Sequence, residues 1–250
     1  MKIQVHCISD VGCLRSGNED MAGVGFHLVR DGEVSAARDT QDGEPFHIVI
    51  ADGMGGHDCG EVASRTALEE LRFTLYDGSR EWLRPEEEIA AEAGRIGAEL
   101  NRMSVETGLV KDMGCTLCGL IWLHGRIYMV NVGDSRLYRL RDGLLRQLSS
   151  DQTLMERDRV PLPEGKALYS CLGGGCLPET VVEDISDRLL GGDRVLVCSD
   201  GLTDMVAEED IERMLGAGTP AQAAGFLVEA ARLAGGADNI TVAVADITID

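Results

Sequence analysis

Aromatic residues are scarce in this chain, where Phe, Trp and Tyr together make up 4% of 250 residues. A core of this composition must consist mainly of aliphatic side chains. Long apolar runs are missing too. No window reaches the roughly 18 apolar residues that a membrane-spanning helix requires, and the N-terminus lacks the apolar stretch of a secretory signal. We therefore expect a soluble, cytoplasmic protein without a membrane partner.

Basic residues are also few, with 23 Lys and Arg against 43 Asp and Glu and a net charge of −20. Contacts to nucleic-acid phosphates require clustered Lys and Arg, so we expect no nucleic-acid partner. Much of the acidity serves solubility, but carboxylates that converge in one cleft need cations to offset their repulsion. The charge is compatible with a metal site without requiring one.

The eight cysteines do not form the pattern of a disulfide framework, because the chain is long and several of them lie within apolar runs. We expect reduced, mostly buried thiols. Cys115 and Cys118 have the spacing of a zinc knuckle, but no second Cys or His pair follows at a matching distance. Their segment is also predicted to be a strand, in which these two side chains face opposite ways. The sequence therefore disfavours a zinc site.

Apolar periodicity in the first part of the chain predicts three strands and then two helices. The strands span residues 3–8, 22–29 and 48–51. Polar loops and a hairpin turn separate them, at residues 10–20, 38–44 and 31–32. The first helix spans residues 58–76. The second begins at Pro85, with three glutamates in its first turn and apolar residues at alternating spacings of four and three.

Four short apolar runs follow, separated by glycine-containing turns, at residues 116–123, 126–132, 137–141 and 144–148. Connections this short force antiparallel pairing, so we predict a four-stranded meander. This pairing excludes a parallel nucleotide-binding sheet. The glycines after Asp52 also lack the Gly-Lys-Ser/Thr ending of a phosphate-binding loop.

The C-terminal part begins with residues 151–175, whose prolines, mixed charge and triple glycine predict a short helix and then a loop. Strands are predicted at residues 181–185, 195–199 and 240–247, with helices at 207–215 and from Thr219-Pro220 to Gly235-Gly236. The predicted order of elements is several strands, two helices, more strands, two helices and a final strand. This order predicts an α+β fold in one domain, residues 1–250, with helix pairs covering sheets.

Carboxylates recur where predicted strands end beside small residues. An apolar run leads directly into Asp52-Gly53. Asp200-Gly201 and Asp238 likewise lie next to apolar runs. An isolated Asp-Gly is an ordinary turn, but the repetition favours a shared role. Carboxylates from distant segments, without His or Cys at ligand spacing, suit Mg²⁺ or Mn²⁺ better than Zn²⁺. Two such ions can clamp a phosphoryl group and activate a water between them.

Six short motifs, spread over nearly the whole chain, carry a resemblance to a known family. They are Arg15-x-x-Asn-Glu-Asp20, Ala51-Asp-Gly-Met-Gly-Gly56, Gly114-Cys-Thr116, Asn131-Val-Gly-Asp-Ser-Arg136, Ser199-Asp-Gly-Leu-Thr-Asp204 and Asp238-Asn-Ile-Thr241. In this order they resemble the metal-dependent protein phosphatases of type 2C, in a bacterial-like form. The resemblance implies a four-layer αββα sandwich, in which helix pairs flank two stacked, mainly antiparallel sheets. It also implies hydrolysis of phosphoserine and phosphothreonine in proteins.

The resemblance further implies roles for single residues. Asp52 would bridge two Mg²⁺ or Mn²⁺ ions, and the Gly53 carbonyl would bind one of them. Asp200 and Asp238 would complete the ligands of the other ion. Glu19 and Asp20 would hold metal-bound waters, and Arg15 would grip the substrate phosphate. Asp134 and Asp204, with Asp200, match positions that bind a third, weaker ion in bacterial relatives.

The partners implied are phosphorylated proteins, the products of a Ser/Thr kinase, and we expect a monomer. The chain has no Gly-x-Ser-x-Gly elbow and no Cys in a phosphate-binding loop to suggest a covalent nucleophile. Met54 stands where animal-type members have a His, as in bacterial relatives, and the segment after Asp151 looks short and Cys-rich for a flap. An alternative is a catalytically silent member that binds phosphoproteins or scaffolds a kinase. The presence of Asp52, Asp200 and Asp238 disfavours it.

Overall fold

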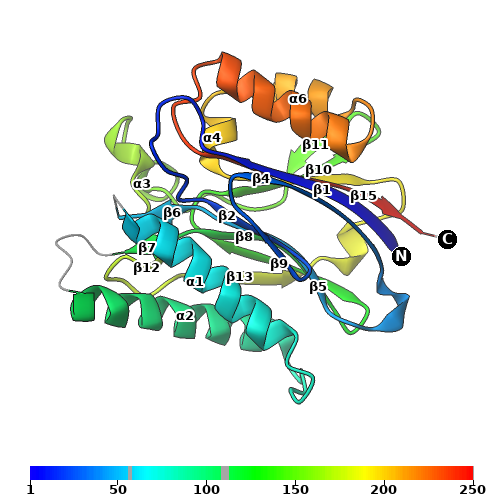
Figure 1. Cartoon of the computed structure of the whole chain (residues 1–250). Coiled ribbons are helices and arrows are strands. Elements are labelled where there is room, and N and C mark those ends of the chain that lie inside the picture. The colour runs from blue at the N-terminus through cyan, green and yellow to red at the C-terminus, as the bar shows by residue number, and fades with distance from the viewer. Residues whose placement is uncertain (56–57, 108–112, 250) are drawn as a thin grey trace.

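Four layers make up the structure, a computed structural model that describes residues 1–55, 58–107 and 113–249. Several helices cover the outer face of a first six-stranded sheet, a second six-stranded sheet stacks on its inner face, and two long helices lie under the second sheet (Figure 1). The predicted αββα sandwich is confirmed. Among the described residues, no helix is both long and apolar enough to cross a membrane.

The first sheet is antiparallel throughout and places the N-terminal strand beside the C-terminal strand. Its order is β11 (Leu144–Gln147), β10 (Arg136–Arg141), β14 (Arg194–Cys198), β15 (Ile240–Thr248), β1 (Lys2–Asp10) and β4 (Gly32–Asp39). Strand β1 pairs with β15 over its whole length, from Lys2 opposite Thr248 to Asp10 opposite Ile240. This long pairing fixes the loop after β1 beside the start of β15.

The second sheet is also antiparallel, and a small three-stranded sheet adjoins it. The order of the large sheet is β13 (Val181–Asp184), β9 (Arg126–Val132), β8 (Leu117–Leu123), β5 (Phe46–Ala51), β2 (Met21–Val24) and β3 (His27–Val29). The small sheet contains β12 (Leu172–Gly173), β7 (Gly114–Cys115) and β6 (Gly53–Met54).

Helices α1 (Asp58–Leu75) and α2 (Pro85–Thr107) cover the second sheet, while α4 (Asp200–Thr203), α5 (Glu208–Leu215) and α6 (Pro220–Leu233) cover the first (Figure 1). The sequence marks the start of α6 well. Thr219 accepts a hydrogen bond from the Gln222 backbone, Gln222 bonds back to the Thr219 backbone, and Pro220 occupies the first turn. The remaining elements are α3 (Leu154–Asp158) and three 3₁₀ turns, η1 (Thr40–Asp42), η2 (Glu164–Lys166) and η3 (Ser186–Arg188).

Three aliphatic cores separate the layers. The core between the two sheets includes Ile3, Ile50 and Leu120, and the other two lie between each sheet and its helices. Cys118 packs between the sheets, whereas Cys115 packs against α1 and α2. These two thiols therefore face opposite layers, as the strand period predicts.

Three local predictions are wrong, because apolar periodicity does not show where a strand turns, which sheet the next strand joins, or that a polar segment continues an edge strand. Residues 22–29 form a hairpin, β2 and β3, with Gly25 at a φ of +57° in the turn. The turn at residues 31–32 makes no hairpin, because β3 and β4 belong to different sheets. Residues 38–39 end β4 instead of lying in a loop.

The predicted four-stranded meander is also interrupted at its centre. Strands β8 and β9 pair, and β10 and β11 pair, but β9 and β10 lie in different sheets. The link of residues 133–135 crosses from one sheet to the other, with Gly133 at a φ of +98°. This crossing carries Asp134 to the end of the sandwich where Asp52 leaves β5. The short helix predicted within residues 151–175 is present as α3.

Candidate active site

Acidic residues converge where three core strands end. Asp52 follows β5, Asp200 follows β14 and opens α4, and Asp238 lies just before β15. A cavity of about 410 Å³ forms there. Seven of the nine predicted site residues line it, namely Arg15, Glu19, Asp52, Gly53, Asp134, Asp200 and Asp238. Asp20 and Asp204, the other two, lie beside the cavity and interact with its acids.

Asp52 is held by a reciprocal pair of hydrogen bonds with Thr116. The Asp52 amide donates to Thr116 Oγ1 at 2.9 Å, and the Thr116 amide donates to the Asp52 carbonyl at 2.9 Å. Thr116 Oγ1 also lies 2.7 Å from the Ser135 hydroxyl, next to Asp134. The backbone of Asp52 is therefore fixed while its carboxylate remains available to the cavity.

Gly53 occupies a position that no other residue type fits. A Cβ there would lie 2.1 Å from the Gly60 carbonyl oxygen and 2.5 Å from the Glu19 carbonyl oxygen. A Cβ on Gly60 would in turn lie 2.7 Å from the Glu19 carboxyl group. The backbones of helix α1, strand β6 and the loop of residues 11–20 thus pack directly against one another, and only glycine permits so close an approach.

Asn239 ties this loop to the start of β15. Its side-chain oxygen accepts a hydrogen bond from the Glu19 amide at 2.8 Å, and its amide group donates to the carbonyls of Val11 and Gly17 at 2.9 and 3.0 Å. The sequence placed Asn239 in a motif but assigned it no role. Its role is to hold the loop that carries Arg15, Glu19 and Asp20 against the cavity.

Asp20 lies beneath the cavity, 1% exposed. The Ser199 hydroxyl donates to Asp20 Oδ2 at 2.8 Å, whereas Asp20 Oδ1 has no hydrogen-bond partner in the part of the chain that the structure describes. A buried carboxylate oxygen without a donor is costly. It suits a cation or an ordered water as its partner.

The acids of the cavity raise one another's pKa. Burial is the largest cause, and it raises the pKa of Asp20 and of Asp134 to about 7 and that of Asp200 to about 6. Burial and then the charges of Asp20 and Asp200 place the pKa of Asp52 well above its usual range. Like charges gathered in a poorly solvated site lower each other's tendency to ionise, which is the condition that a bound cation relieves.

These shifts predict an unusual pH dependence for the metal-free protein. A carboxyl group whose folded pKa exceeds its unfolded value near 4 stabilises the fold at low pH, and this stabilisation is lost as pH rises through the folded pKa. Buried His47, with its pKa lowered by burial to about 3, opposes the trend only below about pH 6.5. In EDTA we therefore expect the melting temperature to fall between about pH 6.5 and about pH 8. Scanning fluorimetry checks this, and a metal-free protein that gains stability over that interval would contradict it.

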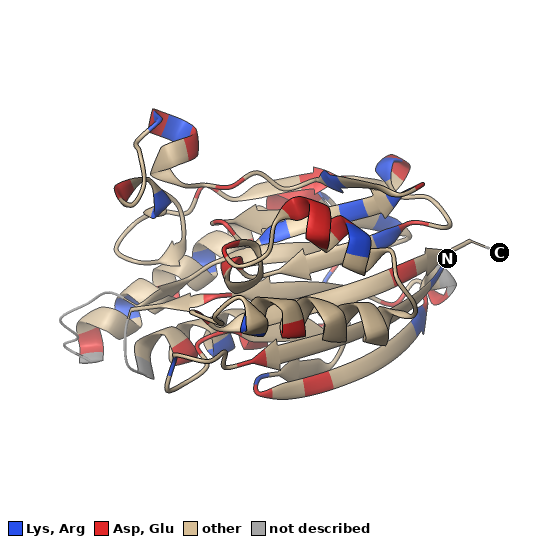
Figure 2. Cartoon of the chain, turned by 90° about the horizontal axis from the view of Figure 1, so that it is seen from above, with Lys and Arg blue, Asp and Glu red and all other residues tan. Residues whose placement is uncertain are grey.

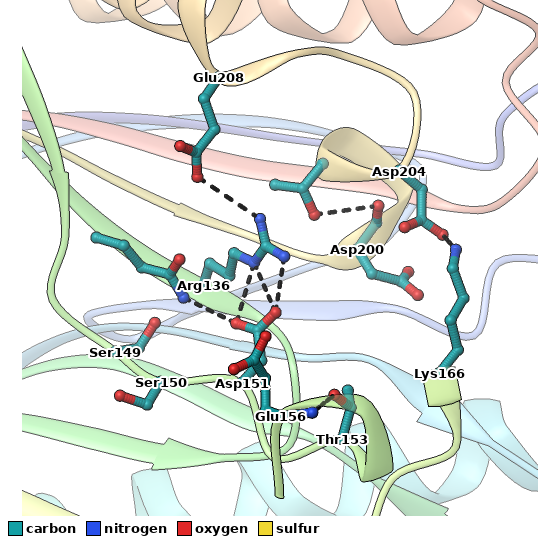
Figure 3. Close-up of polar contacts among 12 residues, drawn as sticks. Arg136, Ser149, Ser150, Asp151, Thr153, Glu156, Lys166, Asp200, Asp204 and Glu208 are labelled. Carbon is teal, nitrogen blue, oxygen red and sulfur yellow. Dashed lines mark hydrogen bonds and ion pairs between the residues drawn. The ribbon is translucent and has the colours of Figure 1, made fainter. Parts of the chain in front are cut away.

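Two basic side chains supply counter-charge. Arg15 Nη2 donates to Asp238 Oδ2 at 2.6 Å, and Lys166, from η2, points toward Asp204 and donates to it, beside Asp200 (Figure 3). Asp204 lies one turn after Asp200, since its amide donates to the Asp200 carbonyl at 2.8 Å. Within residues 1–55, 58–107 and 113–249, the structure contains no group of three or more His, Cys, Asp or Glu side chains arranged closely enough to bind a metal ion.

Lys166 belongs to a segment that Arg136 anchors. The Arg136 guanidinium donates to both carboxylate oxygens of Asp151, with Nη2 to Oδ2 at 2.7 Å, and lies near Glu208 of α5 (Figure 3). This bidentate pair fixes residue 151, where the segment of residues 151–175 leaves the first sheet. Sequence reasoning missed Lys166 because its segment has no periodic pattern. Arg136 belongs to one of the six motifs, but the sequence alone indicates no role for it.

Comparison with known proteins decides the family. The model for "Protein phosphatase 2C" matches residues 33–224. The chain belongs to the protein phosphatase 2C family. It is 34% identical to the serine/threonine protein phosphatase PstP of Mycobacterium tuberculosis in an alignment of 249 positions, which covers 96% of this chain but only 44% of that protein's length. It is 32% identical to the serine/threonine phosphatase stp of Listeria monocytogenes, over 94% of this chain and 92% of that protein.

Solved structures give the same result for the fold. The catalytic domain of PstP in complex with two manganese ions matches with a TM-score of 0.74 and 32% identity, and each chain is covered completely. The α+β class and the stacked antiparallel sheets are those of this phosphatase family. The comparison also says that one family member, PstP, holds two manganese ions.

Charged residues of both signs are mixed along the part of the chain that the structure describes. Figure 2 shows Lys and Arg interleaved with Asp and Glu along the described ribbon. Many of these basic residues are paired with acids, as Arg95 is with Glu70 and Glu92.

Proposed function

We propose that this chain hydrolyses phosphoserine and phosphothreonine in proteins, using a water activated between two Mg²⁺ or Mn²⁺ ions. The observation that carries the proposal is the single cavity in which Asp52, Asp200 and Asp238 meet, with Arg15 at its edge. Family membership supports the same activity. Because the chain spans less than half of PstP, the activity of that whole protein is not assumed for it.

The donor set fits these ions. It consists of carboxylate oxygens and the backbone carbonyl of Gly53, which are the ligands that Mg²⁺ and Mn²⁺ prefer. Asp52 would hold both ions, the Gly53 carbonyl one of them, and Asp200 and Asp238 the other. The raised pKa of Asp52 and the unpartnered Oδ1 of Asp20 mark a site that lacks positive charge. Bound ions supply that charge and make water more acidic.

Arg15 would bind the phosphate of the substrate. Its side chain is half exposed and reaches the cavity from the loop that Asn239 holds. A guanidinium fork can bind two phosphate oxygens at once, and Arg15 would exchange its contact with Asp238 for such a pair. Glu19 and Asp20 would accept hydrogen bonds from water and so orient it.

The competing function is a silent module that binds phosphoproteins or scaffolds a kinase. Loss of acids would favour it, yet Asp52, Asp200 and Asp238 all lie at the cavity. Hydrolysis of p-nitrophenyl phosphate and of a phosphothreonine peptide, each with Mn²⁺ and with EDTA, separates the two functions. Activity that appears only with Mn²⁺ supports the phosphatase, and no hydrolysis under either condition supports the module.

Arg15→Ala is expected to raise KM about tenfold or more for a phosphopeptide, with a smaller change in kcat. The reason is that Arg15 stabilises bound phosphate in the ground state as well as in the transition state. Steady-state kinetics at saturating Mn²⁺ measure both constants. Arg232→Ala is the matched control, because Arg232 pairs with Asp10 outside the cavity. An Arg15 variant with an unchanged KM would exclude this role.

Asp204→Asn is expected to increase the Mn²⁺ concentration needed for half-maximal activity while leaving the maximal rate within a few-fold of wild type. Asp204 would contribute to a third, weaker ion together with Asp134 and Asp200, and not to the first two. Lys166→Met is the control, since it breaks the same ion pair but keeps the carboxylate. An equal rise in metal requirement in both variants would show that the ion pair, and not a third ion, is responsible.

The partners proposed are phosphorylated proteins made by a Ser/Thr kinase. We also propose that residues 1–250 act as a single catalytic domain, as a monomer in the cytoplasm and in signal transduction. A phosphoproteome comparison with and without the gene identifies substrates. Sedimentation of the purified chain tests the monomer.

A further inference from the structure

Two thiols meet in the segment of residues 151–175 and just beyond it, away from the acidic cavity. Cys171 Sγ and Cys176 Sγ lie 3.7 Å apart. Cys171 is buried and Cys176 is partly exposed, and both are free. No step proposed for phosphate hydrolysis uses either one.

The triple glycine between them creates this approach. In extended chain, residues five positions apart lie roughly 17 Å from each other. Here Gly173, Gly174 and Gly175 have φ values of +77°, +61° and +75°, which fold the chain back on itself. A Cβ on Gly174 would lie 2.6 Å from Cys171 Sγ, so glycine is needed at that position to leave room for the sulfur.

The turn is held from outside as well. The Asn101 side chain of α2 accepts a hydrogen bond from the Gly175 amide at 2.8 Å and donates to the Cys176 carbonyl at 3.2 Å. The Gly174 amide donates to the Met113 carbonyl at 2.9 Å. The two sulfurs are therefore kept near each other by contacts that do not depend on a bond between them.

We propose that Cys171 and Cys176 form a dithiol site that oxidises reversibly to an intramolecular disulfide. A disulfide requires sulfur atoms about 2 Å apart, and side-chain rotation beside three glycines supplies the remaining approach. The oxidant is a hydroperoxide of low molecular weight, such as hydrogen peroxide.

Cys176 is the thiol that meets the oxidant, because Cys171 is buried and its pKa is raised to about 12 by that burial. The Cys176 thiolate attacks one peroxide oxygen, an S–O bond forms, the O–O bond breaks, and the departing hydroxide becomes water. Cys171 sulfur then attacks Cys176 sulfur, so that the S–S bond forms and the S–O bond breaks. The hydroxide released takes the Cys171 proton. Two thiols and one peroxide give one disulfide and two waters.

Paired strands connect the linkage to the proposed metal site. Cys171 directly precedes β12, where Leu172 pairs with Cys115 of β7. Cys115 in turn pairs with Gly53 of β6. The disulfide therefore restrains the C-terminal end of the segment that carries Lys166. This end leads into β12, which lies two strands away from β6 and the Gly53 carbonyl.

One tryptic peptide reports the reaction. Cleavage after Lys166 and Arg188 releases residues 167–188, which contain both thiols and no other cysteine. The full chain is treated with hydrogen peroxide in EDTA, alkylated under denaturing conditions and digested. We expect this peptide to lose two hydrogen atoms and take up no alkylating agent, and to regain two alkylation sites after dithiothreitol. A peptide that stays doubly alkylated, while exposed Cys13 in the same sample is oxidised, overturns the proposal.

Two variants distinguish formation of this disulfide from oxidation of other cysteines. Cys176→Ser should keep Cys171 alkylatable after peroxide, whereas Cys13→Ser should still form the disulfide. Oxidised wild type should melt at a higher temperature than reduced wild type, and Cys176→Ser should show no such rise. Peptide mass and melting temperature do not depend on phosphatase activity. If the disulfide forms in all molecules but the melting temperature does not change, the disulfide does not restrain the fold as proposed.

Discussion

Asp52→Asn is expected to lower phosphate hydrolysis by more than about a hundredfold at every Mn²⁺ concentration. Asp52 is the one side chain proposed to hold both ions, and the amide that replaces it lacks the charge that keeps two cations together. Its backbone is fixed by Thr116, so the substitution changes the charge without moving the chain. The rate is measured with p-nitrophenyl phosphate over a full Mn²⁺ titration.

Two controls make that result interpretable. Asp187→Asn removes an exposed acid in η3 that does not line the cavity, and it should leave the rate unchanged. The melting temperature of Asp52→Asn in EDTA should equal or exceed that of wild type, because the variant loses a carboxyl group whose pKa is raised by burial and by its neighbours. Near-native activity in a folded Asp52→Asn variant would contradict the proposal that Asp52 holds both metal ions.

Mn²⁺ is expected to stabilise the wild-type protein strongly, and Asp238→Asn is expected to remove most of that effect. At a free concentration one hundred times the dissociation constant, one site contributes about 2.7 kcal/mol to the free energy of unfolding. Asp238→Asn removes a ligand together with a negative charge that raises the pKa of Asp20, Asp52 and Asp200.

In EDTA this variant should melt at or above wild type. It loses the ion pair with Arg15, but both side chains are more than a third exposed, and such pairs contribute about 1 kcal/mol or less. The relief of repulsion among buried acids is the larger effect. Scanning fluorimetry of both proteins, in EDTA and in Mn²⁺, measures the four melting temperatures. A variant that melts far below wild type in EDTA yet responds normally to Mn²⁺ would show that Asp238 is structural.

The sequence predicted the elements that position the site because their signals are local. Strand β5 is a continuous apolar run that ends at Asp52, and helix α2 begins at Pro85 as its proline and glutamates indicate. The motifs then specified which strand ends meet, although none of them does so alone. Seven of the nine residues taken from the motifs line one cavity for this reason.

What the sequence could not predict depends on contacts between distant segments. A short glycine turn looks the same whether the next strand joins its neighbour or the opposite sheet, so the sequence predicts a meander where the chain in fact crosses between sheets at Asp134. Lys166 reaches Asp204 across 38 positions from a segment without periodicity. The pairing of Cys171 with Cys176 needs three positive φ angles, which the triple glycine permits but does not require.

Anomalous diffraction at the manganese edge, from crystals grown in Mn²⁺, tests most directly whether these acids form a two-ion centre. We predict two strong peaks in the cavity, one in contact with Asp52 and the Gly53 carbonyl, and the other in contact with Asp52, Asp200 and Asp238. A cavity that holds no manganese at saturating concentration, or an ion bound without Asp52, would contradict the proposed site.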